Sequence, residues 1–185
     1  MKLLKLISER MPDLKNILAV YAFIVTLVYS WTLFTSFYKL PSWLFYLSIG
    51  QILSVYAYAF SFDLLESLIA LTVILLLDFT VFLFLKNKEE FQSRSMILAG
   101  ILLGTSMTRL ALFQNYEDIT AFLSGELLWW SIAIPLGLVL AVFAPRIKLV
   151  RTIFEGFAER ATVFVYIYIP LSLIALVVVL IRNIN

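Results

Sequence analysis

Two charged residues stand inside long apolar runs of the sequence. Asp78 interrupts the run 66–85, and Arg109 interrupts the run 95–113. A charged side chain at the centre of a membrane helix costs about 2.5 to 3.5 kcal/mol on insertion scales, so such a residue needs a partner or a role. The chemistry open to this pair is proton or cation transfer, pairing with an opposite charge, or recognition of another subunit.

Hairpin geometry predicts which carboxylate lies near Arg109. If the chain turns near Glu90, the two runs are antiparallel, with Glu66 about 8 Å from Arg109 along the axis and Asp78 about 10 Å away in the other direction. An arginine side chain extends toward the nearer membrane surface, which here lies on the Glu66 side. The sequence therefore predicts that Arg109 pairs with Glu66 and leaves Asp78 without an evident charged partner.

Three interpretations of Asp78 stay open. It forms a hydrogen bond to a Ser, Thr or Tyr of a neighbouring helix, belongs to a proton or cation path, or contacts another subunit. Gln51 is a further polar residue in the middle of an apolar run. Glu66, Asp78, Arg109 and Gln51 together form the candidate intramembrane polar site.

The residue types that the chain lacks exclude several kinds of chemistry. With no cysteine and no histidine, it builds no disulfide, thiolate nucleophile, histidine base or Cys/His zinc site. A paired-aspartate site would need a second aspartate at depth, and the sequence predicts Asp63 in a connector. The six glycines are scattered and form no phosphate-binding loop. We predict no catalytic residue, no metal ligand and no cofactor, and therefore a protein that is not an enzyme.

The composition predicts where these residues are held. Hydrophobic side chains make up 63% of the 185 residues, against about 45–50% in a soluble domain. This excess predicts a membrane protein. A formal charge of +2 is too small to predict a nucleic-acid partner. Membrane lipids and homo- or hetero-oligomeric membrane partners are the expected contacts.

Six apolar runs are long enough to cross a bilayer as helices, since about 20 residues span 30 Å of hydrocarbon. They are 16–38, 40–62, 66–85, 95–113, 127–144 and 161–181. The run 40–62 is the weakest crossing candidate, because it opens with Pro41 and carries Gly50 and Gln51 near its middle. We predict an all-α polytopic helix bundle with five spanning helices, or alternatively six, in a single domain covering 1–185.

The basic residues favour five crossings. They gather before the first run, after the third and after the fifth, and cytoplasmic flanks collect Lys and Arg. Only if one of the first three runs fails to cross do all three groups fall on one side. We therefore expect the N-terminus on the cytoplasmic side of a bacterial or archaeal cytoplasmic membrane.

Two segments are predicted to lie along the membrane surface or to dock a partner. In addition, one helix face is predicted to pack closely against another helix. Segment 1–16 is expected to be a cytoplasmic amphipathic segment, and 146–161 an interfacial amphipathic helix. Gly100, Gly104 and Thr108 recur at four-residue spacing, which lets another helix backbone approach.

These patterns support three hypotheses about function. The first is a non-catalytic integral membrane protein that serves as a subunit or scaffold of a membrane assembly. The second is a small transporter or channel with a polar path near Asp78 and Arg109. The third is a lipid-handling membrane protein, in which Arg109 would face an open lateral groove.

Overall fold

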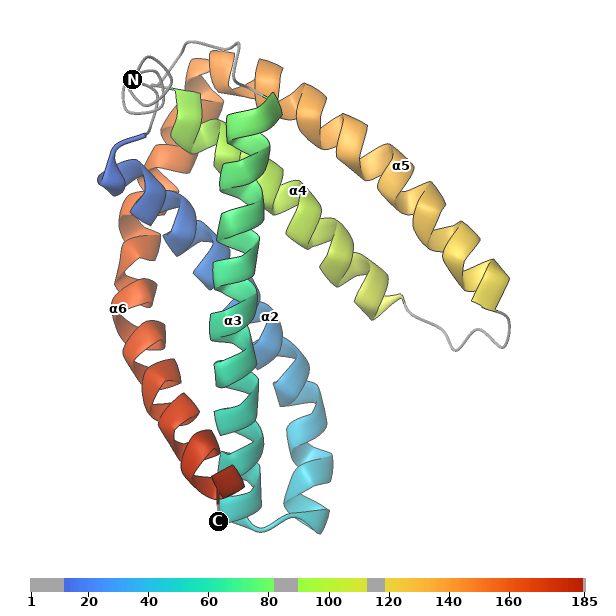
Figure 1. Ribbon diagram of the computed structural model, residues 1–185, viewed down its shortest axis with the longest axis vertical. Helices are drawn as coiled ribbons and strands as arrows, with labels where there is room; N and C mark the ends of the chain where they lie inside the picture. The colour runs from blue at the N-terminus through green and yellow to red at the C-terminus, as the bar shows by residue number, and fades with distance from the viewer. Residues whose placement is uncertain (1–11, 82–89, 113–118, 185) are drawn as a thin grey trace.

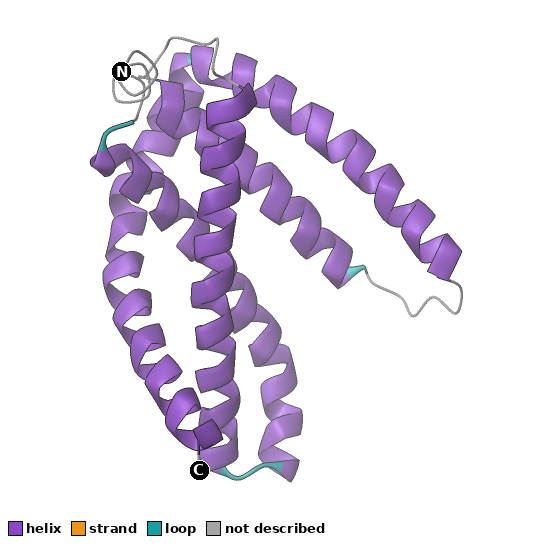
Figure 2. Cartoon of the chain, viewed as in Figure 1, coloured by secondary structure: helices purple, strands orange, loops and turns teal. Residues whose placement is uncertain are grey.

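The computed structural model describes residues 12–81, 90–112 and 119–184 of the chain. All regular structure in these ranges is helical. The elements are α2 (Leu14–Tyr46), α3 (Ile49–Val81), α4 (Phe91–Ala111), α5 (Ile119–Phe143), the short 3₁₀ helix η2 (Ala144–Arg146) and α6 (Lys148–Ile184). Figure 2 shows how little of the described chain lies outside helices. Most of segment 1–16 and the predicted loop charges between 82 and 89 lie outside the described residues.

Successive helices run in opposite directions and form two groups (Figure 1). Helices α2, α3 and α6 pack against one another along their lengths, whereas α4 packs mainly against α2 and α5. Helix α5 makes its contacts with α4 and η2, and the α4–α5 hairpin diverges from the other three helices toward the end where α5 begins. The bundle is therefore a three-helix core with a hairpin attached at one end.

The buried core lies where α2 meets the other helices. Val20, Ile24, Val25 and Tyr29 of α2 are fully buried, and Leu98 of α4 is almost so. Most large apolar side chains on the outer faces of α3, α5 and α6 are exposed. In water such exposure would be unfavourable, so the fold matches a bilayer as its solvent.

Four of the described helices are long and apolar enough to cross a membrane: α2, α3, α5 and α6. Helix α4, with 21 residues, is shorter and carries Arg94 and Arg109. The protein is thus an all-helical chain with four apolar helices of membrane-spanning length in the described ranges. The finer prediction of five or six crossings remains a proposal.

The first two helices end at places that the sequence analysis did not predict. Helix α2 continues through Pro41 to Tyr46, and α3 is one helix through the expected connector at Asp63. The run 40–62 is thus divided between two helices and does not form a re-entrant element of its own. The reason is a capping box at Ser48 and Gln51: the Ser48 N–H donates to Gln51 Oε1 at 2.8 Å, and the Gln51 N–H points to Ser48 Oγ at 3.4 Å.

The last helix also joins two predicted elements. Helix α6 is continuous over 37 residues, so the segment 146–161 supplies the last residue of η2 and the first turns of this helix rather than a separate helix. The sequence from Lys148 to Ile169 contains no proline, and Gly156 alone does not interrupt a helix. Pro170 lies inside α6. Ala158 and Ala161 are buried in the bundle.

Basic residues gather at one end of the bundle. Lys15 lies in the first turn of α2, Arg94 lies in the first turn of α4, and Arg146 and Lys148 flank the junction between α5 and α6. These helix ends lie together at the upper end in Figure 1, whereas the turn between α2 and α3 and the C-terminus lie at the lower end. We call the upper end the basic end.

Candidate functional site

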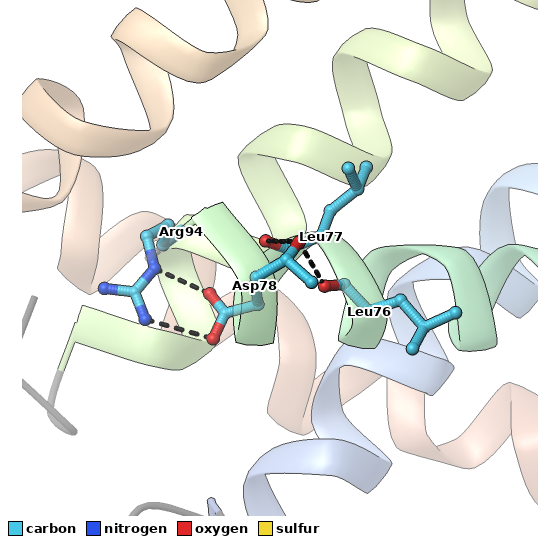
Figure 3. A network of polar contacts seen from close by, with 5 residues as sticks. Leu76, Leu77, Asp78 and Arg94 are labelled. Carbon is cyan, nitrogen blue, oxygen red and sulfur yellow. Dashed lines mark hydrogen bonds and ion pairs between the residues drawn. The ribbon is translucent and has the colours of Figure 1, made fainter. Parts of the chain in front are cut away.

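Asp78 has a charged partner, contrary to the sequence prediction. Arg94 Nε donates to Asp78 Oδ1 at 2.7 Å and Arg94 Nη2 donates to Oδ2 at 3.2 Å, in a two-pronged ion pair between the end of α3 and the start of α4 (Figure 3). The two side chains are only 13% and 5% exposed. A parallel pair of charge-assisted hydrogen bonds fixes both orientation and distance. The pair fastens the α4–α5 hairpin to the three-helix core at the basic end.

Arg109 pairs with Glu126 of α5 and not with Glu66. Its Nε donates to Glu126 Oε1 at 2.8 Å, and Nη2 lies 2.6 Å from the same oxygen. The guanidinium also lies over the Trp129 ring, 5.6 Å from its centroid. Glu66 is exposed on α3. The expected pairing failed because α4 diverges from α3, so that its second half faces α5.

Asp63 is a buried carboxyl that the sequence analysis assigned to a connector. It lies within α3, is 4% exposed, and its Oδ1 accepts a hydrogen bond of 2.7 Å from Thr32 Oγ1 of α2. The other oxygen, Oδ2, is buried without a hydrogen-bond partner among the described residues. Asp63 and Asp78 are about 22 Å apart along the helix, so they form no aspartate pair.

Hydroxyl groups join the three core helices around Tyr29. The Tyr29 hydroxyl shares a 2.6 Å hydrogen bond with Ser172 Oγ of α6, and its ring stacks on Tyr168 at 4.6 Å between centroids. About two helical turns before it, Tyr21 shares a 3.4 Å hydrogen bond with Ser67 of α3. Such polar contacts between membrane helices are worth about 0.6 kcal/mol each on average, and here they hold α2, α3 and α6 together.

The four candidate polar residues are therefore not gathered into one site. Gln51 caps α3 at the end opposite the basic end, Glu66 is exposed, and Asp78 and Arg109 belong to separate ion pairs. No three Asp or Glu side chains of the described ranges are placed to hold a metal ion. The arrangement connects helices and gathers no reactive groups.

The small residues pack in a different way from the one predicted. A Cβ added to Gly100 would lie 3.4 Å from the Phe23 ring, whereas Gly104 has open space around it. An equally close contact is made from α5, where a Cβ at Gly137 would lie 3.4 Å from Ile101 of α4. Ala133 is four residues from Gly137 and also buried. The same four-residue spacing in α5 identifies this face, which the sequence analysis missed.

Three residues important to the architecture were not among the predicted site residues: Asp63, Arg94 and Glu126. Each is an ionisable residue that helical spacing could have placed opposite a partner once the helix ends were known. No protein-family model, curated protein or solved structure matches this chain. The functional argument therefore depends on its own residues.

Proposed function

We propose that the protein is a non-catalytic subunit or scaffold of a membrane assembly. The observation that carries this proposal is the isolation of helix α5. Its main contacts are with α4 and η2, and its other faces are apolar and exposed, with Leu127 at 72% and Ile132 at 59%. A helix that projects from a bundle presents a surface on which a helix of another chain can pack.

The charge arrangement supports the same proposal. Two arginines on α4 are paired within the protein, Arg94 with Asp78 and Arg109 with Glu126. The Arg109 pair locks α4 to α5 near the free end of the hairpin. The hairpin is therefore an internally braced arm rather than a loose segment, which favours a fixed docking geometry.

The open face of α4 indicates where such a partner fits. Gly104 has open space where a Cβ would project, and Thr108, one turn further along, is exposed with its hydroxyl bonded to the Gly104 carbonyl at 2.7 Å. Small residues on an uncovered helix face permit close approach of a second backbone. We infer that the partner is a helix, supplied by another copy or by another membrane protein.

A photo-crosslinking experiment tests the assembly. A photoreactive amino acid at Ile132 on α5 is compared with one at Ile174 on α6, which is also exposed, at 64%. We expect protein crosslinks from Ile132 and only lipid adducts from Ile174, with a native mass above that of one chain after mild detergent extraction. A monodisperse monomer without protein crosslinks at Ile132 would contradict the proposal.

The proposed topology has α2 starting in the cytoplasm and five crossings, α4 included. It is supported by the common position of Lys15, Arg94 and Lys148 at the basic end, since positive residues mark cytoplasmic flanks. Single cysteines at Lys148 and Ser48 can be labelled from one side of sealed vesicles. We expect cytoplasmic labelling at Lys148 and external labelling at Ser48; labelling of both from one side would exclude the topology.

A second candidate function, a small transporter, is favoured by Asp63 alone. A buried carboxyl with one unpaired oxygen is the kind of group that binds protons or cations within membranes. Flux through reconstituted protein should then be abolished by Asp63→Asn and retained by Glu66→Gln, because Glu66 is exposed. Equal flux in wild type and Asp63→Asn would remove this candidate.

A further inference from the structure

An apolar pocket of about 330 Å³ lies between α4, α5, η2 and α6 at the basic end. Its volume is at the lower end of the roughly 300–1,000 Å³ range of small-molecule pockets. The lining residues include Gly100, Ile101, Leu140, Ala144, Val150 and Phe154, and every residue of the lining is apolar or glycine. We call this space the α4–α6 pocket.

The wall of the pocket is held in place by aromatic packing. Phe154 packs against Phe23 of α2 with ring centroids 5.9 Å apart, and Phe23 also contacts Phe157 at 5.5 Å. Ala144 leaves room where a larger side chain would project, whereas a Cβ at Gly100 would already lie 3.4 Å from the Phe23 ring. The small side chain of Ala144 therefore contributes to the open space of the pocket.

Two positive charges lie close in the chain to the lining residues, at the same end of the bundle. Arg146 and Lys148 are exposed and are each two residues from a lining residue, Ala144 and Val150 respectively. Neither has an ion-pair partner among the described residues, and the Arg146 guanidinium lies 5.2 Å from the centroid of the Phe143 ring. Arg151, by contrast, is engaged with Glu155 at 2.8 Å.

We propose that the α4–α6 pocket binds one acyl chain of an anionic phospholipid whose phosphate contacts Arg146 and Lys148. The apolar lining accepts hydrocarbon and offers nothing to a polar ligand. Basic residues beside a pocket between membrane helices attract anionic headgroups. A partner helix does not fit, because a helix with its side chains is about 10–12 Å across, whereas a single extended hydrocarbon chain is far thinner.

This site is independent of the proposed assembly function. It uses the basic end of the bundle, whereas the proposed docking face lies on α5 and the far half of α4. It also differs from the lipid-handling hypothesis, which placed a headgroup at Arg109; that guanidinium is engaged with Glu126 and Trp129.

Native mass spectrometry of the full chain tests the proposal. Protein in detergent is mixed with equal amounts of phosphatidylglycerol and phosphatidylcholine of the same acyl chains, and the retained lipid is counted. We expect one retained phosphatidylglycerol per chain. In the Arg146→Gln/Lys148→Gln variant, the preference for phosphatidylglycerol over phosphatidylcholine should fall by roughly fivefold for each charge removed. The Arg182→Gln variant, changed at the opposite end of α6, should keep the wild-type preference.

A second variant separates the acyl chain from the headgroup. Ala144→Leu should fill the pocket and reduce retention of both lipids, while Val139→Leu, exposed on α5, should leave retention unchanged. Circular dichroism confirms that each variant is folded.

Two outcomes would overturn the proposal. One is unchanged phosphatidylglycerol retention in both the charge variant and Ala144→Leu. The other is loss of oligomeric mass, rather than of lipid, in Ala144→Leu, which would assign the pocket to a side chain of a second copy.

Discussion

The two-pronged pair of Asp78 and Arg94 provides the sharpest test of the structure. Replacing Asp78 with leucine removes hydrogen bonds of 2.7 and 3.2 Å and leaves a guanidinium whose side chain is 5% exposed without this carboxylate. Breaking a buried pair by removing one partner costs about 3–5 kcal/mol, because the remaining buried charge loses that interaction. We expect Asp78→Leu to lower the free energy of unfolding by about 3 kcal/mol.

A double-mutant cycle, in which Arg94 is also replaced by leucine, reveals the cause of that loss. In Asp78→Leu/Arg94→Leu neither charge of the pair remains, and apolar replacement of a whole buried pair is often neutral. The double variant should therefore be more stable than Asp78→Leu. Unfolding in mixed micelles with increasing dodecyl sulfate, followed by circular dichroism, measures all the variants.

The protein contains a matched control for this cycle. Arg151 and Glu155 form a pair of similar length, 2.8 Å, but their side chains are 36% and 43% exposed. Exposed pairs four residues apart contribute only a few tenths of a kcal/mol, so Glu155→Leu should change stability little. If the losses from Asp78→Leu and Arg94→Leu simply add in the double variant, the two side chains do not interact and the arrangement of α3 and α4 is wrong.

Two further predictions concern contacts between helices, each measured by the same unfolding assay. Tyr29→Phe removes a 2.6 Å hydrogen bond to buried Ser172 and should cost about 1 kcal/mol, and adding Ser172→Ala should cost little more; a full additive loss would contradict the contact. Gly137→Leu should cost about 1–3 kcal/mol by overpacking against Ile101, whereas Gly104→Leu, which points into open space, should be neutral or stabilising; equal effects would contradict the packing of α4 on α5.

The helix ends were the part of the fold that the sequence predicted least well. Hydrophobicity indicated where apolar helix exists, but it did not show that Pro41 stays within α2 or that Asp63 lies inside α3. A membrane helix tolerates proline when neighbouring groups satisfy the backbone, so Pro41 was a weak boundary signal. The capping box of Ser48 and Gln51 was the better signal, and it was visible in the sequence.

The misassigned pairing of the charges came from the position of one turn. When the hairpin was taken to turn at Glu90, no basic residue of the second run lay level with Asp78. A hairpin centred four residues earlier places Asp78 level with Arg94, which is 16 residues further along the chain. The same reasoning applied to the next hairpin would have placed Arg109 opposite Glu126, 17 residues away. Ion pairs across a hairpin thus depend on a register that hydropathy alone does not define.

The sequence by itself determined that the chain is helical and apolar enough for a membrane, and that Asp78 and Arg109 must be compensated. Composition and run length decide this, because hydrocarbon accepts neither free backbone groups nor free charges. Only the tertiary structure decided which charges meet, that Asp63 is buried against Thr32, and that an apolar pocket opens between α4, α5, η2 and α6. These features depend on helix crossing and divergence, which bring together residues that are far apart in the chain.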